Sequence, residues 1–191
     1  GTIHGESAYS IWDRVVNDLG VPTTSFKATD FAIVSAPIRF KGSLKRNRRL
    51  IEITEVKKDW NEDPLRENGF LPWMAFDANK DDLEFFEEKL GESEWLSKIK
   101  RMRGLSIDEI WSEVRARGET KQYLVDVKRK FEVPRILEAE YSLHAQTRYL
   151  LLAERQRDEF GSVDYPALMV DWKKWVDGVL APAAVAEKQV S

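Results

Sequence analysis

The spacing of apolar residues changes along the chain, and this change restricts the folds that the chain can adopt. In residues 6–19 apolar side chains recur with the spacing of an amphipathic helix, which Ser7 would cap. Residues 31–40 and 49–56 instead have the composition of β-strands, and residues 41–47 between them suit a turn. The first part of the chain therefore predicts a helix followed by a β-hairpin.

Beyond residue 70 the apolar spacing is almost entirely helical. Residues 70–77 predict a short extended piece, and capping residues, Gly and Pro then separate a series of amphipathic segments. The predicted helices are residues 81–90, 93–103, 106–117, 119–131, 135–160 and a last helix from residue 165. We therefore expect an α+β, predominantly helical fold, in which a helix and a β-hairpin precede a helical bundle.

Charge and composition predict a domain boundary near residues 57–70. Residues 1–58 carry ten Lys or Arg against six Asp or Glu, a net charge of +4, whereas the remaining 133 carry 20 against 27, a net charge of -7. Residues 59–69 are polar and contain both a Pro and a Gly, which is typical of a linker. The sequence thus predicts a first segment over 1–58, a linker over 59–69, a helical domain over 70–180 and a frayed tail over 181–191.

The content of Cys and His excludes several kinds of site. The chain has no Cys, so disulfides, thiolate nucleophiles and cysteine-based zinc sites are excluded. Its two histidines are far apart in sequence, and we expect no metal site. The apolar runs are too short to span a bilayer, and the first residues lack the pattern of a signal peptide. These features predict a soluble, cytoplasmic protein.

Residues 2–56 resemble a known protein family. The resemblance depends on three segments. They are the run Thr2-Ile3-His4-Gly5-Glu6-Ser7-Ala8 with Arg14 after it, the strand at 28–34, and the basic hairpin that ends in the strand at 48–56. In this order they resemble the end of the motor domain of type II/IV secretion ATPases, the hexameric engines of type II secretion, type IV pili and the archaellum. The order of the later helices resembles the C-terminal extensions of archaeal members.

The resemblance implies a role for the first segment in nucleotide chemistry. Residues 1–58 would be the C-terminal part of a RecA-like core that binds ATP and Mg. The run around His4, called the His box, would lie close to the terminal phosphate, with Thr2, Glu6 and Arg14 as further nucleotide-binding candidates. Other interpretations remain open: His4 as an exposed residue, Ser7 as a helix cap only and Arg14 as a surface ion pair.

The phosphate-binding motif that this chemistry needs is absent from the sequence. The motif G-x-x-x-x-G-K-[ST] cradles the phosphates in such ATPases, and it occurs nowhere in these residues. In the family it precedes the His box. We therefore expect the chain to be the C-terminal piece of a longer ATPase, unable to hydrolyse ATP alone and without a cofactor of its own.

A basic cluster in the hairpin has several interpretations. It comprises Arg39, Lys41, Lys45, Arg46, Arg48 and Arg49, with no acidic residue among them. The resemblance favours an interface with the next subunit of a ring, to which Arg39, Arg46, Arg48 and Arg49 would contribute, or a solvated turn. The helical domain would then serve docking or subunit packing against a membrane platform protein, which would place the cytoplasmic chain at the membrane through a partner.

Two alternatives belong to other functional classes. The first is a DNA-binding regulator that uses the basic hairpin or the helix pair in 106–131, although the net acidity of the second segment disfavours nucleic acid. The second is a structural adaptor without a ligand. The spacing of residues shows no pair of carboxylates and no nucleophile with its base that would support independent catalysis.

Overall fold

The computed structural model describes residues 1–39 and 44–188, and the chain forms two compact units, Gly1–Gly104 and Leu105–Ser191. Helices account for 57% of the structure, and the described residues form seven α-helices and one four-stranded antiparallel sheet. The expected α+β, predominantly helical class is therefore confirmed. Within the described part of the chain, no helix is both long and apolar enough to cross a lipid bilayer.

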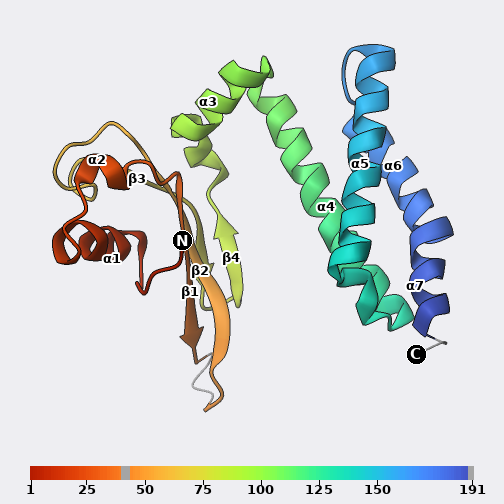
Figure 1. The fold of residues 1–191 in the computed structure, drawn as a ribbon, viewed down its shortest axis with the longest axis horizontal. Helices are drawn as coiled ribbons and strands as arrows, with labels where there is room; N and C mark the ends of the chain where they lie inside the picture. The colour runs from red at the N-terminus through yellow and green to blue at the C-terminus, as the bar shows by residue number, and fades with distance from the viewer. Residues whose placement is uncertain (40–43, 189–191) are drawn as a thin grey trace. The chain divides into compact units, whose positions relative to one another are not determined.

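The first unit is built on an antiparallel sheet whose strands follow one another in sequence. Its strands are β1 (Phe31–Ile38), β2 (Asn47–Val56), β3 (Phe70–Asp77) and β4 (Asp82–Phe85), in the order β1-β2-β3-β4 (Figure 1). The predicted hairpin is confirmed, since β1 pairs with β2 and Ile33 faces Ile53. Part of its predicted turn, residues 40–43, lies outside the described residues.

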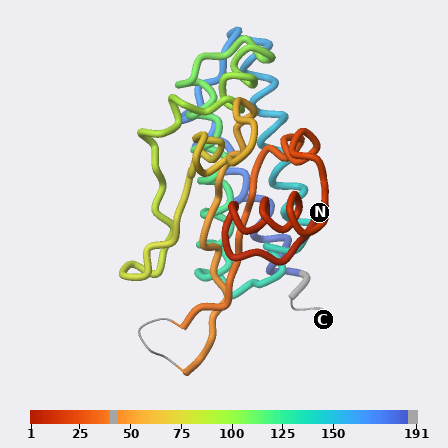
Figure 2. The backbone as a smooth tube through the Cα atoms, turned by 90° about the vertical axis from the view of Figure 1, so that its left-hand side faces the viewer, coloured from red at the N-terminus to blue at the C-terminus, as the bar shows by residue number. Residues whose placement is uncertain are grey.

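Two short helices lie beside the first strands, as Figures 1 and 2 show. Helix α1 (Ala8–Asp13) continues into a π-helical turn (Arg14–Asp18), and α2 (Thr23–Phe26) follows. Ser7 caps α1, because its hydroxyl accepts a hydrogen bond from Ser10 N, and Gly20 lies just beyond the last turn with a φ of +68°. The predicted helix over 6–19 and its cap are confirmed.

Residues 59–69, the expected linker, pack into the first unit. Trp60 is 2% exposed and lies edge-on to Trp12 and Phe26, at ring distances of 6.3 and 6.5 Å. Residues 70–77 then form β3, which pairs with the second edge of β2. The division between the units thus differs from the expected one, because β2 has hydrogen-bonding groups on both edges and the chain after it returns to satisfy them.

The prediction of a helix over residues 81–90 is wrong. The chain turns at Asp81, which has a φ of +52°, pairs β4 with β3 and then forms a 3₁₀-helix, Glu87–Glu92. The guanidinium of Arg49 donates two hydrogen bonds of 2.8 Å to the carboxylate of Asp81 and so fixes the turn. Helix α3 (Glu94–Arg103) follows, as predicted, with Ser93 as its N-cap.

The second unit is entirely helical in its described residues. It consists of α4 (Ile107–Phe131), a 3₁₀-turn (Pro134–Leu137), α5 (Ala139–Phe160), α6 (Tyr165–Trp175), a π-helical turn (Val176–Leu180) and α7 (Ala181–Lys188) (Figure 1). A continuous apolar core joins these helices, centred on Trp172, Leu168 and Ile136, each fully buried. The core extends into the expected tail, where Ala184 is also fully buried.

The helix pair predicted within 106–131 is one continuous helix, α4. Gly118 separates the two predicted helices in the sequence, but a glycine inside a helix costs only about 1 kcal/mol relative to Ala. The hydroxyl of Thr120 donates to the carbonyl of Arg117, one turn earlier in the same helix, and Ala116 and Thr120 are both buried. Burial of this face on either side of Gly118 therefore outweighs the local preference for a break.

Candidate functional site

The first unit contains a pocket of about 650 Å³ between the extended residues 1–5 and strand β1. Its wall on the β1 side comprises the five consecutive residues 31–35. Because successive side chains of a strand point to opposite faces, a surface that touches five in a row follows the edge of the strand. Among the described residues β1 pairs only with β2, and residues 1–5 make no backbone hydrogen bond to β1.

Local contacts fix the path of residues 1–5 at the mouth of this pocket. A Cβ atom at Gly5 would lie 2.5 Å from Ile11 Cγ1, so only glycine fits where the chain passes over α1. At the start of α1, the backbone N–H of Ala8 donates to the Glu52 carboxylate of β2 at 3.2 Å. These contacts tie the turn after His4 to both the helix and the sheet.

The polar groups of the pocket suit an anion. Its lining includes two basic residues, His4 and Arg48, and four residues that carry a hydroxyl group, Thr2, Ser25, Thr29 and Ser35. No Asp or Glu is among the lining residues. Donors without a competing carboxylate are the chemistry that binds phosphate or another oxyanion.

The structure brings together three of the residues singled out from the sequence. Thr2, His4 and Arg48 line the pocket, although Arg48 was considered for a subunit interface and not for a nucleotide site. Glu6 and Arg14 do not line it, and both are exposed.

The other basic candidates lie outside the pocket. Arg39 and Arg46 are exposed. Arg49 is bound within the chain by Asp81, and this hydrogen bonding raises the pKa of the guanidinium above its usual value. Lys41 lies outside the described residues.

Sequence reasoning missed the hydroxyl groups of the pocket and the buried carboxylate of Glu55. Ser25, Thr29 and Ser35 belong to no motif, and only folding brings them beside His4. Glu55 is 1% exposed in β2. In the sequence it is the next alternate residue after Ile51 and Ile53, and this spacing indicates that its side chain shares their face of the strand. A charged residue that is almost fully buried needs hydrogen-bond partners within the fold.

Comparison with protein-family models and with curated proteins gives no match for this chain. In residues 1–39 and 44–188, no group of three or more His, Asp or Glu side chains is arranged to hold a metal ion.

Proposed function

We propose that residues 1–58 are the last part of the motor domain of a type II/IV secretion ATPase, and that the pocket beside His4 is the share of the nucleotide site contributed by this segment. The observation that supports this proposal is the meeting of His4 and Arg48 in a pocket without carboxylates. The resemblance implies that His4 lies near the terminal phosphate. The residues that line the pocket carry the basic and hydroxyl groups that bind a phosphate.

The residues of the pocket have distinct roles in this proposal. The imidazole of His4 donates to a phosphate oxygen or orients the attacking water, and Arg48 balances the negative charge of the phosphates. The hydroxyl of Thr2 supplies a further hydrogen bond. Mg would be held elsewhere, because its preferred carboxylate ligands are missing from the lining.

The free edge of β1 gives this proposal a structural basis. A strand from the rest of a RecA-like core would lie between residues 1–5 and β1 and pair with the edge that β2 leaves open. Such a strand would bring the phosphate-binding loop to the pocket. Alone, the chain would bind phosphate groups weakly and not hydrolyse ATP.

The remaining surfaces would serve assembly. Arg39 and Arg46 are exposed and have no ion pair among the described residues, so they are available to acidic groups of the next subunit in a ring. The helical second unit would dock on a neighbouring subunit or on a membrane platform protein. The DNA-binding alternative loses its helix pair, since α4 is one helix, and retains only the hairpin.

The test compares this chain with a version extended by the coding sequence upstream of Gly1. We expect the upstream sequence to encode G-x-x-x-x-G-K-[ST] and the extended protein to hydrolyse ATP, whereas the present chain does not. In the extended protein, His4→Gln should lower kcat at least tenfold, because a group at the phosphate is lost. His144→Gln, on the exposed surface of α5, is the matched control and should leave kcat unchanged.

Two results would overturn the proposal. One is an upstream sequence without the phosphate-binding motif. The other is equal activity of the two histidine variants in the extended protein. Duplex DNA binding by the present chain that weakens steeply between about 50 and 200 mM salt would favour the DNA-binding alternative instead.

A further inference from the structure

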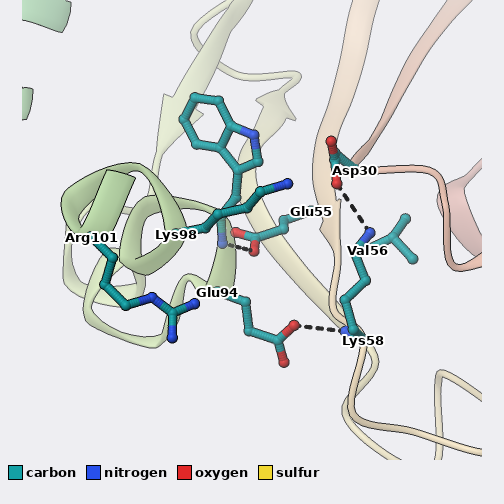
Figure 3. Close-up of a pocket in the computed structure, with 8 residues that line it drawn as sticks. Asp30, Glu55, Val56, Lys58, Glu94, Lys98 and Arg101 are labelled. Atoms are coloured by element: carbon teal, nitrogen blue, oxygen red, sulfur yellow. Dashed lines mark hydrogen bonds and ion pairs between the residues drawn. The ribbon is translucent and has the colours of Figure 1, made fainter. Parts of the chain in front are cut away.

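A second, smaller pocket lies in the first unit where α3 approaches the end of β2. Its volume is about 200 Å³. Three carboxylates and three basic side chains line it, together with Val56 and Trp95; the charged residues are Asp30, Glu55, Glu94, Lys58, Lys98 and Arg101 (Figure 3). The formal charges of this lining cancel. The charge that is available to a ligand therefore depends on which of the six charged groups already have partners within the chain.

Two of the three carboxylates are engaged by Lys58. Its Nζ atom lies 3.2 Å from Asp30 Oδ1 and also donates to the carbonyl of Thr29 at 2.6 Å. The backbone N–H of the same lysine donates to Glu94 Oε2 at 2.7 Å (Figure 3). Both the side chain and the backbone N–H of Lys58 therefore already have partners within the chain.

The third carboxylate, Glu55, is held by three donors. Its Oε2 atom accepts from Trp73 Nε1 at 3.0 Å and from the Ser93 hydroxyl at 2.6 Å, and its Oε1 atom accepts from the backbone N–H of Trp95 at 2.8 Å. With 1% of its surface exposed, Glu55 is a structural group at the start of α3. It does not need a cation from the pocket.

The two basic residues of α3 that line this pocket have no partner among the described residues. Lys98 and Arg101 stand one turn apart on the helix, and neither has a hydrogen bond or an ion pair to any described residue. Both project from α3 on the side where Glu55 and Glu94 lie (Figure 3). The free charge of the pocket is therefore cationic, while each of its carboxylates has a donor.

We propose that this pocket binds a single carboxylate group, clamped between Lys98 and Arg101. A guanidinium pairs with a carboxylate through two parallel hydrogen bonds, and an ammonium adds a point charge. Because the lining is neutral in sum, one carboxylate leaves a formal charge of about -1, whereas a phosphate dianion leaves about -2 beside three carboxylates. The volume is below the roughly 300 Å³ of a drug-sized site, which fits a short acid or an acidic side chain.

This inference is independent of the proposed ATPase role, and its test uses the present chain. Propionate and a blocked peptide with a single Glu are titrated separately while the backbone and indole NMR signals of Trp95 are followed. We expect saturable shifts with at least one of the two, and the one that binds more tightly identifies the source of the carboxylate. The double variant Lys98→Gln, Arg101→Gln should weaken binding at least tenfold.

Lys100→Gln provides the matched control, since Lys100 is an exposed lysine of the same helix that does not line this pocket. It should change the affinity by less than twofold. The altered side chains are exposed, so unchanged thermal unfolding of all variants would show that the fold is intact. Absence of saturable shifts, an equal effect of the control, or tighter binding of inorganic phosphate than of propionate would overturn the proposal.

Discussion

The two units achieve their folds by different kinds of contact. In the first unit, carboxylates of β2 reach other elements: Glu52 accepts from the start of α1, and Glu55 accepts from the start of α3 and from Trp73. In the second unit, helices satisfy their own backbones and share one apolar core around Trp172. The first unit therefore depends on specific polar partners, whereas the second depends mainly on burial.

The largest expected effect is on the core of the second unit. Trp172 is fully buried, and its indole N–H donates to the carbonyl of Ala145 at 2.9 Å. Trp172→Ala should lower the free energy of unfolding of this unit by about 3–5 kcal/mol through the lost burial and the cavity left behind. Chemical denaturation followed by NMR signals of both units measures the loss.

Val170→Ala, at an exposed site of the same helix, is the control and should cost less than about 0.5 kcal/mol. Equal losses from the two variants would contradict a core centred on Trp172. A loss spread equally over signals of both units would contradict the difference between them, because it would show that the first unit depends on the same core.

The polar connections of the first unit are tested at Glu55. Glu55→Leu leaves the three donors without an acceptor and should cost about 2–4 kcal/mol in the free energy of unfolding. Equilibrium denaturation with Glu62→Gln as an exposed control in the same unit gives the comparison. If the free energy of unfolding of Glu55→Leu equalled that of the wild type, burial alone would explain the stability of the first unit, as it does for the second.

The packing of residues 59–69 is tested at Gly69. A Cβ atom there would lie 2.7 Å from Trp60 Cδ1 and 2.8 Å from Pro64 Cβ, so Gly69→Ala should destabilise the first unit by about 1–3 kcal/mol. Gly91→Ala, where a Cβ meets nothing within 4 Å, is the matched control for thermal unfolding. A neutral Gly69→Ala would restore the interpretation of this stretch as a loose linker.

The smallest expected effect concerns a polar contact of the second unit at alkaline pH. The hydroxyl of Tyr123 donates to Asp177 at 2.8 Å, and burial together with this carboxylate raises the pKa of Tyr123 to about 12. Since the phenol ionises near pH 10 in the unfolded chain, its contribution to stability is complete below about pH 10 and is lost as the pH rises toward 12.

Denaturation of the wild type and of Tyr123→Phe between pH 8 and 12 measures this contribution. The phenylalanine variant should lose less stability over that range than the wild type. Parallel curves for the two proteins would show that Tyr123 ionises as readily in the folded unit as in the unfolded chain.

Local signals predicted several elements correctly. Ser7 and Gly20 mark the ends of the first helix, and Ser93 and Gly104 mark those of α3. These helices were predictable because a capping hydroxyl and a left-handed glycine act on residues only a few positions away. The hairpin was predictable for a similar reason, since β1 and β2 are neighbours in sequence.

Elements that depend on distant partners were not predictable in the same way. Residues 82–85 have helical spacing but pair with β3, next to a turn that Arg49 of β2 fixes by hydrogen bonds to Asp81. Gly118 reads as a break, yet α4 continues through it because the faces on both sides are buried. In each case a long-range contact outweighed a local preference of about 1 kcal/mol or less.

The candidate site was predictable only in part. The resemblance drew attention to Thr2 and His4, and the basic cluster to Arg48, but no pattern connects these residues with Ser25 or Thr29. The pocket exists because α1 and α2 return the chain so that β1 runs beside residues 1–5. Its lining is therefore a property of the chain path and not of a motif.

The fold class, the capped helices and the hairpin are predictable from the sequence, because they follow from apolar spacing and from contacts within a few residues. Only the folded chain reveals the third and fourth strands, the continuity of α4, the packing of residues 59–69 and the groups that share each pocket. Those features depend on which buried polar groups find partners and which apolar faces meet, and such choices are made between residues far apart in the chain.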